Sequence, residues 1–291
     1  MIGYIMLILA LIHALYDAKN NRIQRLLMLI TLFIYGFLLE YLGVRAGNYT
    51  YASETIMLFE IIPLSVTCAW VGIIYSIMLI GDFLELSPLM RIITTTLIAL
   101  SIDWGMDPIA VELGAWTWTI EGQYYGIPGF NFIGWFFIPI AYLLPYEIVW
   151  NKELKKVQLL TIKQIEDHQS LTRKLYTLLV IVPIAVGFLI LVGIISRIPI
   201  LYNMNVIALS IWAILTVVIS AAIISWKRRN LNRKKLYELI PPIILLLLAV
   251  LYTFYGFFIG RIDLGFLMLL TGIPIWLIFS FMVFNKTSRE K

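Results

Sequence analysis

The chain has 291 residues, of which 61% are hydrophobic and 13% are charged, and it carries a formal net charge of +5. A water-soluble domain of this composition would expose a large apolar surface, so the composition favours the membrane and excludes the common soluble classes. The excess of basic residues lies mainly between the apolar runs, where membrane topology accounts for it. We therefore expect no nucleic-acid partner.

Long apolar runs separated by short polar segments predict an all-α fold, namely a polytopic transmembrane bundle of about nine helices. The expected spans are residues 2–16, 23–43, 55–80, 89–106, 131–150, 175–196, 203–226, 239–259 and 264–284. Basic residues gather in alternate connections, beginning with the first, which places the N-terminus outside and the C-terminus inside. The prediction is a multi-pass protein of the cell membrane.

Three segments are distinguished within what we expect to be one integrated membrane domain. Residues 1–150 form an N-terminal helical bundle that carries the acidic and aromatic residues, and residues 151–174 form a polar cytoplasmic linker. Residues 175–291 form a C-terminal segment of four membrane helices. No internal repeat is visible, which weakens a transporter interpretation.

Acidic residues inside or beside apolar runs need a reason, because a charge at the bilayer centre costs about 2.5–3.5 kcal/mol on insertion scales. Glu40, Glu60, Asp103 and Asp107 are such residues, and Glu112 follows them. Asp103 and Asp107 are four residues apart, so on a helix ended by a following proline their carboxyl groups project from one face. Two adjacent carboxyl groups in a poorly solvated pocket share a proton, as a general acid requires.

Simpler interpretations remain open for each acid. Asp103 and Asp107 are also compatible with a hydrated position at the outer interface of the membrane. Glu40 and Glu60 are equally compatible with structural hydrogen bonds to hydroxyl groups of neighbouring helices and loops. The hydroxyl groups considered are those of Tyr49, Tyr51 and Thr67.

Glycine, proline and aromatic residues dominate the segment from residue 114 to residue 135. This segment is typical of an aromatic belt at a membrane interface. Beside the acids, it also favours an apolar pocket whose ring faces stabilise a developing carbocation. His13, His168 and the lone Cys68 lack the spacing of a metal site, so none is predicted.

These motifs resemble those of the carotenoid biosynthesis membrane proteins, a family that includes carotenoid hydratases of bacteria and haloarchaea. The resemblance is strongest over residues 36–136. It is carried by Glu40–Val44, Tyr49, Tyr51, Pro63–Trp70, Asp103–Pro108, Trp116–Trp118, Tyr124–Pro128 and Asn131–Trp135. It implies a hydro-lyase that adds water to a terminal isoprenoid C=C bond of an acyclic C40 or C50 carotenoid, as in bacterioruberin-type biosynthesis, without a cofactor.

For this activity we expect Asp103 and Asp107 to be the proton donor and the water-positioning base, with Glu40 or Glu60 as their partner. Expected substrate-binding residues are Glu112, Trp116, Trp118, Tyr124, Tyr125, Asn131, Trp135, Trp70 and Tyr51. The expected partners are the acyclic carotenoid and membrane lipid, with other enzymes of the carotenoid pathway as further candidates.

Two other functions stay open at this stage. The DxxxD spacing of Asp103 and Asp107 suits Mg²⁺ and diphosphate, as in a membrane prenyltransferase or elongase. The acids of a non-enzymatic lipid carrier would instead be structural or would relay protons.

Overall fold

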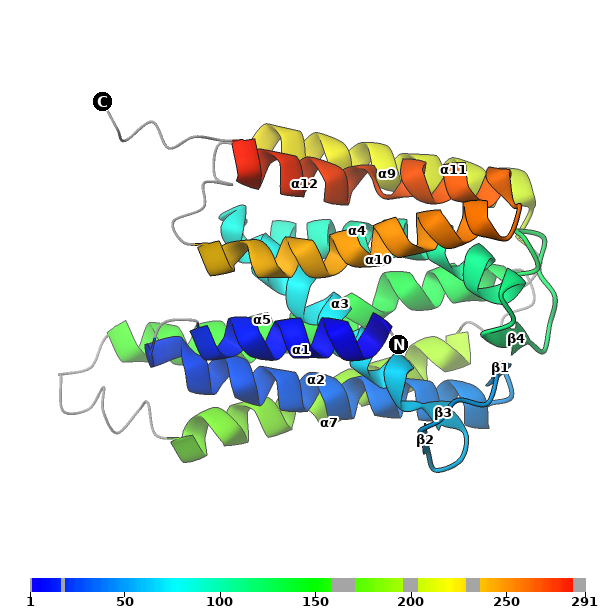
Figure 1. Ribbon diagram of the computed structural model, residues 1–291. Coiled ribbons are helices and arrows are strands. Elements are labelled where there is room, and N and C mark those ends of the chain that lie inside the picture. Colours follow the sequence, from blue (N-terminus) through cyan, green and yellow to red (C-terminus); the bar gives the residue numbers. More distant parts are fainter. Residues whose placement is uncertain (1, 17–18, 159–170, 196–203, 229–235, 285–291) are drawn as a thin grey trace.

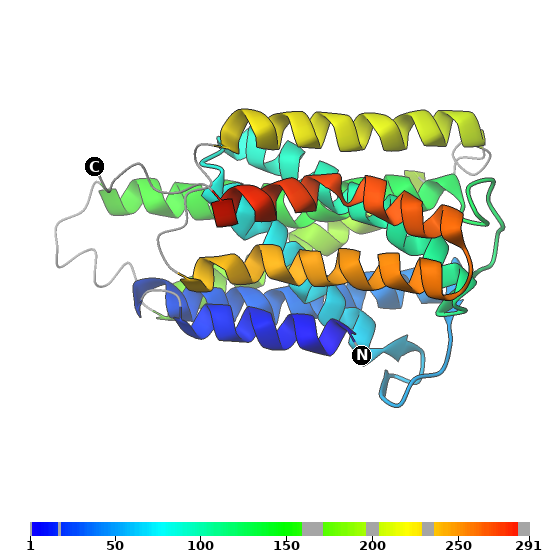
Figure 2. The same cartoon turned by 45° about the horizontal axis from the view of Figure 1, so that its top comes forward.

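The computed structural model describes residues 2–16, 19–158, 171–195, 204–228 and 236–284. They form a bundle of long helices that share one general direction (Figures 1 and 2). The helices are α1 (Ile2–Tyr16), α2 (Lys19–Arg45), α3 (Leu64–Phe83), α4 (Pro88–Glu112), α5 (Gly129–Gln158), α7 (Leu171–Ile195), α9 (Val206–Lys227), α10 (Ile240–Phe258), α11 (Ile262–Thr271) and α12 (Ile273–Phe284), with a 3₁₀ turn at Leu236–Leu239.

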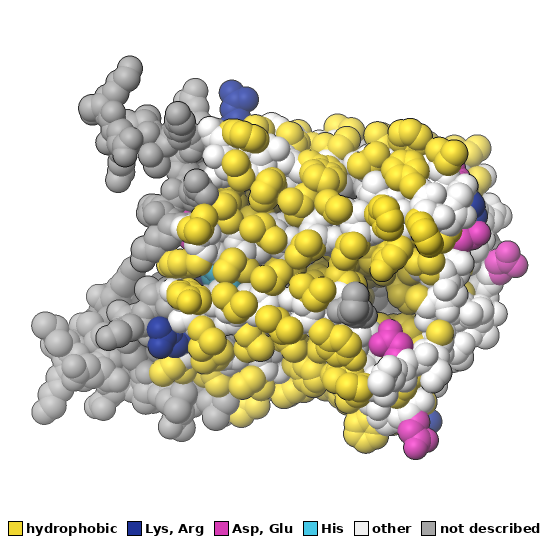
Figure 3. All heavy atoms as spheres, in the orientation of Figure 1, with side chains coloured by type: hydrophobic (Ala, Val, Ile, Leu, Met, Phe, Trp, Pro, Cys, Tyr) yellow, Lys and Arg dark blue, Asp and Glu magenta, His cyan; other side chains and the backbone are white. Residues whose placement is uncertain are grey.

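Six of the described helices are long and apolar enough to cross a membrane. The count rises to seven if α11 and α12, which meet at a bend of 52°, form one broken span. Hydrophobic side chains cover most of the face shown in Figure 3, and the charged side chains visible there lie toward its two ends. The membrane-type helical fold is therefore confirmed, whereas the count of nine and the orientation stay predictions.

Helix α3 lies at the centre of the bundle and packs against α1, α2, α4 and α10. Helix α4 is also covered on several sides, by α5, α9 and α11. The C-terminal helices thus pack directly on the helices of the first half. Helix α5 continues to Gln158, into the expected linker, and residues 159–170 lie outside the described part of the chain.

The expected helix over residues 55–80 is wrong in its first turns. Strands β2 (Met57–Leu58) and β3 (Ile62–Pro63) form a short hairpin, and α3 begins only after Pro63. Pro63 disfavours a helical conformation in the residue before it, so this apolar segment cannot join the helix. Glu60 occupies the exposed hairpin turn, with a φ of +62°, and not a membrane helix.

Helix α4 also departs from expectation, because Pro108 does not end it. The helix continues to Glu112, and the chain leaves it at Gly114, whose φ of +68° suits glycine. A buried proline is tolerated within a membrane-type helix when neighbouring groups satisfy the freed backbone carbonyl. The acidic pair therefore lies within a continuous helix and not at its end.

A two-stranded ribbon forms where the sequence suggested only loops. Strand β1 (Tyr49–Tyr51) pairs antiparallel with β4 (Trp116–Trp118), and Thr50 lies opposite Thr117. Because successive strand residues point to opposite faces, the two tyrosines and the two tryptophans share one face. That face is partly buried, while both threonines are exposed. The ribbon thus presents four aromatic side chains to the end of the bundle.

Candidate functional site

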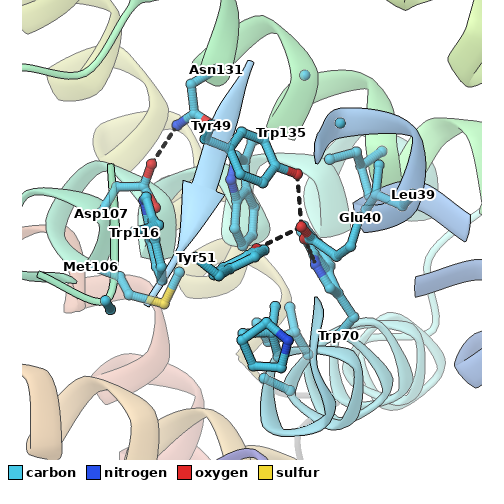
Figure 4. Close-up of a pocket in the computed structure, with 18 of the residues that line it drawn as sticks. Leu39, Glu40, Tyr49, Tyr51, Trp70, Met106, Asp107, Trp116, Asn131 and Trp135 are labelled. Atoms are coloured by element: carbon cyan, nitrogen blue, oxygen red, sulfur yellow. Dashed lines mark hydrogen bonds between the residues drawn. The ribbon is translucent and has the colours of Figure 1, made fainter. Parts of the chain in front are cut away.

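A cavity of about 690 Å³ lies beneath the ribbon, between the ends of the helices (Figure 4). This volume is within the range of about 300–1,000 Å³ that is usual for ligand pockets. Its polar wall comes from α2, α4, α5 and the ribbon, and apolar side chains from α1, α3, α7 and α10 complete it. The site thus combines a few buried acids with a hydrocarbon-like interior.

Glu40 of α2 lies on one side of the cavity and is held by three donors. The hydroxyl groups of Tyr49 and Tyr51 donate to Oε2 at 2.7 Å and 2.5 Å. The indole Nε1 of Trp70, from α3, donates to Oε1 at 2.5 Å. Burial, and then the neighbouring Glu40 carboxylate, raises the pKa of both tyrosines, so they stay protonated donors. Such charge-assisted bonds fix a carboxylate firmly.

Asp107 and Asp103 lie across the cavity on α4. The Nδ2 amide of Asn131, from α5, donates to Asp107 Oδ2 at 2.7 Å and to Asp103 Oδ2 at 2.9 Å. The expectation that both carboxyl groups share one helix face is therefore confirmed. Asp107 lines the cavity, whereas Asp103 lies behind it. Their side chains are 2% and 0% exposed, so the hydrated interfacial alternative is wrong.

Aromatic rings fill the wall between the two acidic positions. Trp70 and Trp135 pack at 4.4 Å between ring centroids, beside Glu40 (Figure 4). On the ribbon, Tyr49 contacts Trp118 and Tyr51 contacts Trp116 edge to face, at 5.0 Å and 6.0 Å. The faces of such rings carry partial negative charge and attract cations. The wall therefore suits a positively charged carbon more than an anion.

Besides Asp103, which lies behind the cavity wall, four of the expected site residues lie outside this cavity. Besides Glu60, these are Glu112, Tyr124 and Tyr125. Glu112 accepts a hydrogen bond from Arg261 at 2.6 Å at the bundle end. The Tyr124 hydroxyl donates to the backbone carbonyl of Trp104, in α4, at 3.1 Å. Tyr125 lies in an exposed turn. They lie at the end of the bundle, outside the cavity, and their expected role in substrate binding stays a prediction.

One acidic residue of the cavity escaped the sequence analysis. Glu54 lies at the cavity rim, between β1 and β2, and both of its oxygens accept from Ser65 Oγ, at 2.9 Å and 2.7 Å. A carboxylate in a polar loop carries no hydropathy signal, so nothing in the sequence marked it. Within the described ranges, no group of three or more His, Cys, Asp or Glu side chains is placed to hold a metal ion.

Comparison with known proteins agrees with the resemblance noted in the motifs. The carotenoid biosynthesis protein family matches residues 1–209. The chain is also 27% identical over 143 residues to bisanhydrobacterioruberin hydratase of Haloarcula japonica. That alignment covers 46% of this chain and 47% of the hydratase, so the chain spans about half of its relative. No solved structure matches. The match over residues 1–209 shows that the chain belongs to the carotenoid biosynthesis protein family.

Proposed function

We propose that this protein is a carotenoid hydratase of the cell membrane, which adds water to a terminal isoprenoid C=C bond of an acyclic carotenoid. The observation that carries the proposal is that Asp107 and Glu40 face one apolar, aromatic cavity from opposite sides. Family membership and the hydratase relative support a role on carotenoids. Hydration of an unactivated alkene needs an acid and a cation-stabilising wall, which are the two features of this cavity.

The first step is proton delivery from Asp107. Asp103 Oδ2 and Asp107 Oδ2 accept from the same amide nitrogen of Asn131, at 2.9 Å and 2.7 Å, and two buried carboxyl groups this close share a proton. Asn131 orients both carboxyl groups, and Asp107 presents its oxygen to the cavity. Asp107 gives its proton to the less substituted alkene carbon, and the π electrons form the new C–H bond. A tertiary carbocation remains at the other carbon.

The second step is stabilisation and capture of that carbocation. The Glu40 carboxylate lies across the cavity and provides negative charge, and the Trp116 and Trp135 rings form part of the lining. A water molecule adds its oxygen lone pair to the cation, and the proton that it then loses returns to the acidic pair. The sum is one water added across one double bond, with the protein unchanged and no redox step.

The largely apolar lining of the cavity strengthens the electrostatic interactions of this mechanism. Charges interact more strongly in a low-dielectric interior than in water. The three donors already hold Glu40 in place, so they do not need to reorganise when the cation forms. A preorganised site therefore avoids the free-energy cost of reorganisation during the reaction. The same interior keeps the concentration of water low, so the carbocation meets the positioned molecule and few others.

The test is mass analysis of the pigments made by a carotenoid-producing host that expresses this protein. We expect the wild type to add one or two water molecules per acyclic carotenoid, with or without a chelator. Asp107→Asn should lower this activity by at least about 100-fold, the lower range for loss of a general acid. Glu60→Gln is the matched control, because Glu60 is acidic but lies outside the cavity, and it should be fully active.

Other outcomes would identify the alternatives. A product lengthened by isoprenoid units, formed only without chelator, would replace hydration by prenyl transfer. Unchanged pigments with suitable acyclic substrates would favour the lipid carrier. Full activity in Asp107→Asn would remove the acid from the mechanism.

A further inference from the structure

The cavity has an apolar arm that none of the steps above uses. It extends from the acids toward α5 and α7, where Ile138 of α5 and Leu189, Ile190 and Ile194 of α7 line it. Ile190 and Ile194 are also 47% and 64% exposed, so this arm reaches the apolar outer surface of the bundle. A ligand in this arm would extend from the acidic part of the cavity to the surrounding lipid.

Two glycines leave a gap in the seam between α5 and α7, which is the line along which these two helices pack beside the cavity. The rings of Phe137 and Phe188 close the seam at 5.9 Å between centroids. Toward the ribbon end, Gly134 of α5 and Gly193 of α7 both line the cavity. Within the part of the chain that the structure describes, no atom lies within 4 Å of a Cβ atom placed on either glycine. The missing side chains therefore leave a slot, open from the cavity to the side of the bundle.

The seam between α1 and α3, which also borders the cavity, is closed. A Cβ on Gly3 of α1 would lie 1.8 Å from the carbonyl oxygen of Ser65, so the two backbones are in direct contact. The seam of α5 and α7 is thus the better lateral passage.

We propose that the slot beside Gly134 and Gly193 holds the polyene chain of the substrate, which leaves the cavity sideways into the bilayer while its end group lies at Asp107. This inference rests on the proposed function and deepens it. A carotenoid is about as long as the 30 Å bilayer core, whereas a cavity of this volume suits a drug-sized ligand. Only the end of such a substrate fits inside, so the remainder needs an exit that a hydrocarbon can occupy.

The slot predicts that the protein processes long substrates one end at a time. The part of the polyene outside the slot lies in lipid, where no protein group limits its length. Acyclic substrates of different total length should therefore be accepted equally, provided that their end groups match.

The experiment fills the slot with an aromatic side chain. Gly193→Phe and Gly134→Phe block it from opposite walls, and the open surroundings of both glycines allow the ring to enter without a backbone clash. Gly187→Phe is the matched control, because Gly187 lies on the same helix in equally open surroundings but does not line the cavity. Size-exclusion profiles and thermal unfolding of each purified variant in nanodiscs establish that it is folded.

Two readouts separate this inference from the proposed function. Absorbance measures the acyclic carotenoid that co-purifies with the protein, and mass analysis measures hydration of the carotenoid and of a short acyclic C10 alkene. We expect Gly193→Phe and Gly134→Phe to lower carotenoid binding and hydration at least tenfold, with C10 hydration within twofold of wild type. Gly187→Phe should behave as wild type.

Carotenoid binding and hydration at wild-type levels in both blocked variants would overturn the slot and leave the proposed function intact. Equal loss of carotenoid and C10 hydration would also overturn it, because the ring would then disturb the acids and not the chain's path. If the wild type binds carotenoid without hydrating it and the blocked variants lose that binding, the slot stands and the hydratase proposal fails.

Discussion

At the scale of single residues, the site depends on how closely Glu40 is surrounded. Gly43 lies one turn after Glu40 on α2, and a Cβ at that position would lie 2.3 Å from the Tyr49 hydroxyl. The phenol therefore occupies space that any other residue at position 43 would fill. The glycine permits the hydrogen bond between Tyr49 and Glu40 and contributes no group of its own.

Gly43→Ala should push the Tyr49 hydroxyl away from Glu40 and lower hydration activity, while the fold is retained because the displaced atom ends a side chain. Tyr49→Phe, which removes the same hydrogen bond without a clash, should show a similar loss. A hydrogen bond to a charged group contributes about 1.5–3 kcal/mol, so both variants should unfold at a lower temperature. Tyr41→Phe, on the same helix outside the cavity, is the control, and equal loss in it would contradict this account.

Glu112→Gln tests a residue that the sequence suggested for substrate binding and that the structure places outside the cavity. Its partner Arg261 lies at the same exposed end of the bundle, and exposed ion pairs contribute at most about 1 kcal/mol. We expect unchanged hydration activity and a nearly unchanged unfolding temperature. Strong loss of activity with an intact fold would show that Glu112 acts on the substrate.

At the scale of elements, apolar run length predicted most helices, because the bilayer sets both their length and their composition. It failed for the hairpin before Leu64 and for the ribbon of β1 and β4. Strand pairing between distant segments leaves no periodic signal in two or three residues each. Asp103 and Asp107 could be predicted as a pair from their spacing alone, whereas the meeting of Glu40 with Trp70 depends on tertiary packing.

The crossing of α4 and α11 requires a glycine between the two aspartates. A Cβ on Gly105 would lie 2.3 Å from Thr271 Oγ1 and 2.9 Å from the Met268 Cα. Gly105→Ala should therefore force the helices apart and destabilise the protein by about 1–3 kcal/mol, the usual cost of overpacking. Thermal unfolding in detergent measures the effect. Gly187→Ala, in open surroundings, should leave stability unchanged, and equal stability of both variants would exclude a tight crossing.

At the scale of the whole molecule, the ribbon and the site lie at one end of the bundle, and the turn between α3 and α4 lies at the other (Figure 1). The positive-inside rule predicts that the ribbon end faces the outside. In a Cys68→Ala background, Ser53→Cys should react with a membrane-impermeant maleimide in intact cells. Glu85→Cys, in the α3–α4 turn, should react only after permeabilisation. The reverse pattern would invert the orientation and place the acids at the cytoplasmic side.

The way in which the cavity's acids are held bears on selectivity. A hydrocarbon offers no hydrogen bond, so it cannot complete a partly satisfied polar group when it arrives. In this protein Glu40 already accepts hydrogen bonds from Tyr49, Tyr51 and Trp70. Asp107 already accepts one from Asn131. Recognition of the end group therefore depends on its shape. The double bond contributes to the reaction only in the proton-transfer step and adds nothing to binding. A carotenoid with a saturated end should occupy the site as tightly as a substrate and act as a competitive inhibitor.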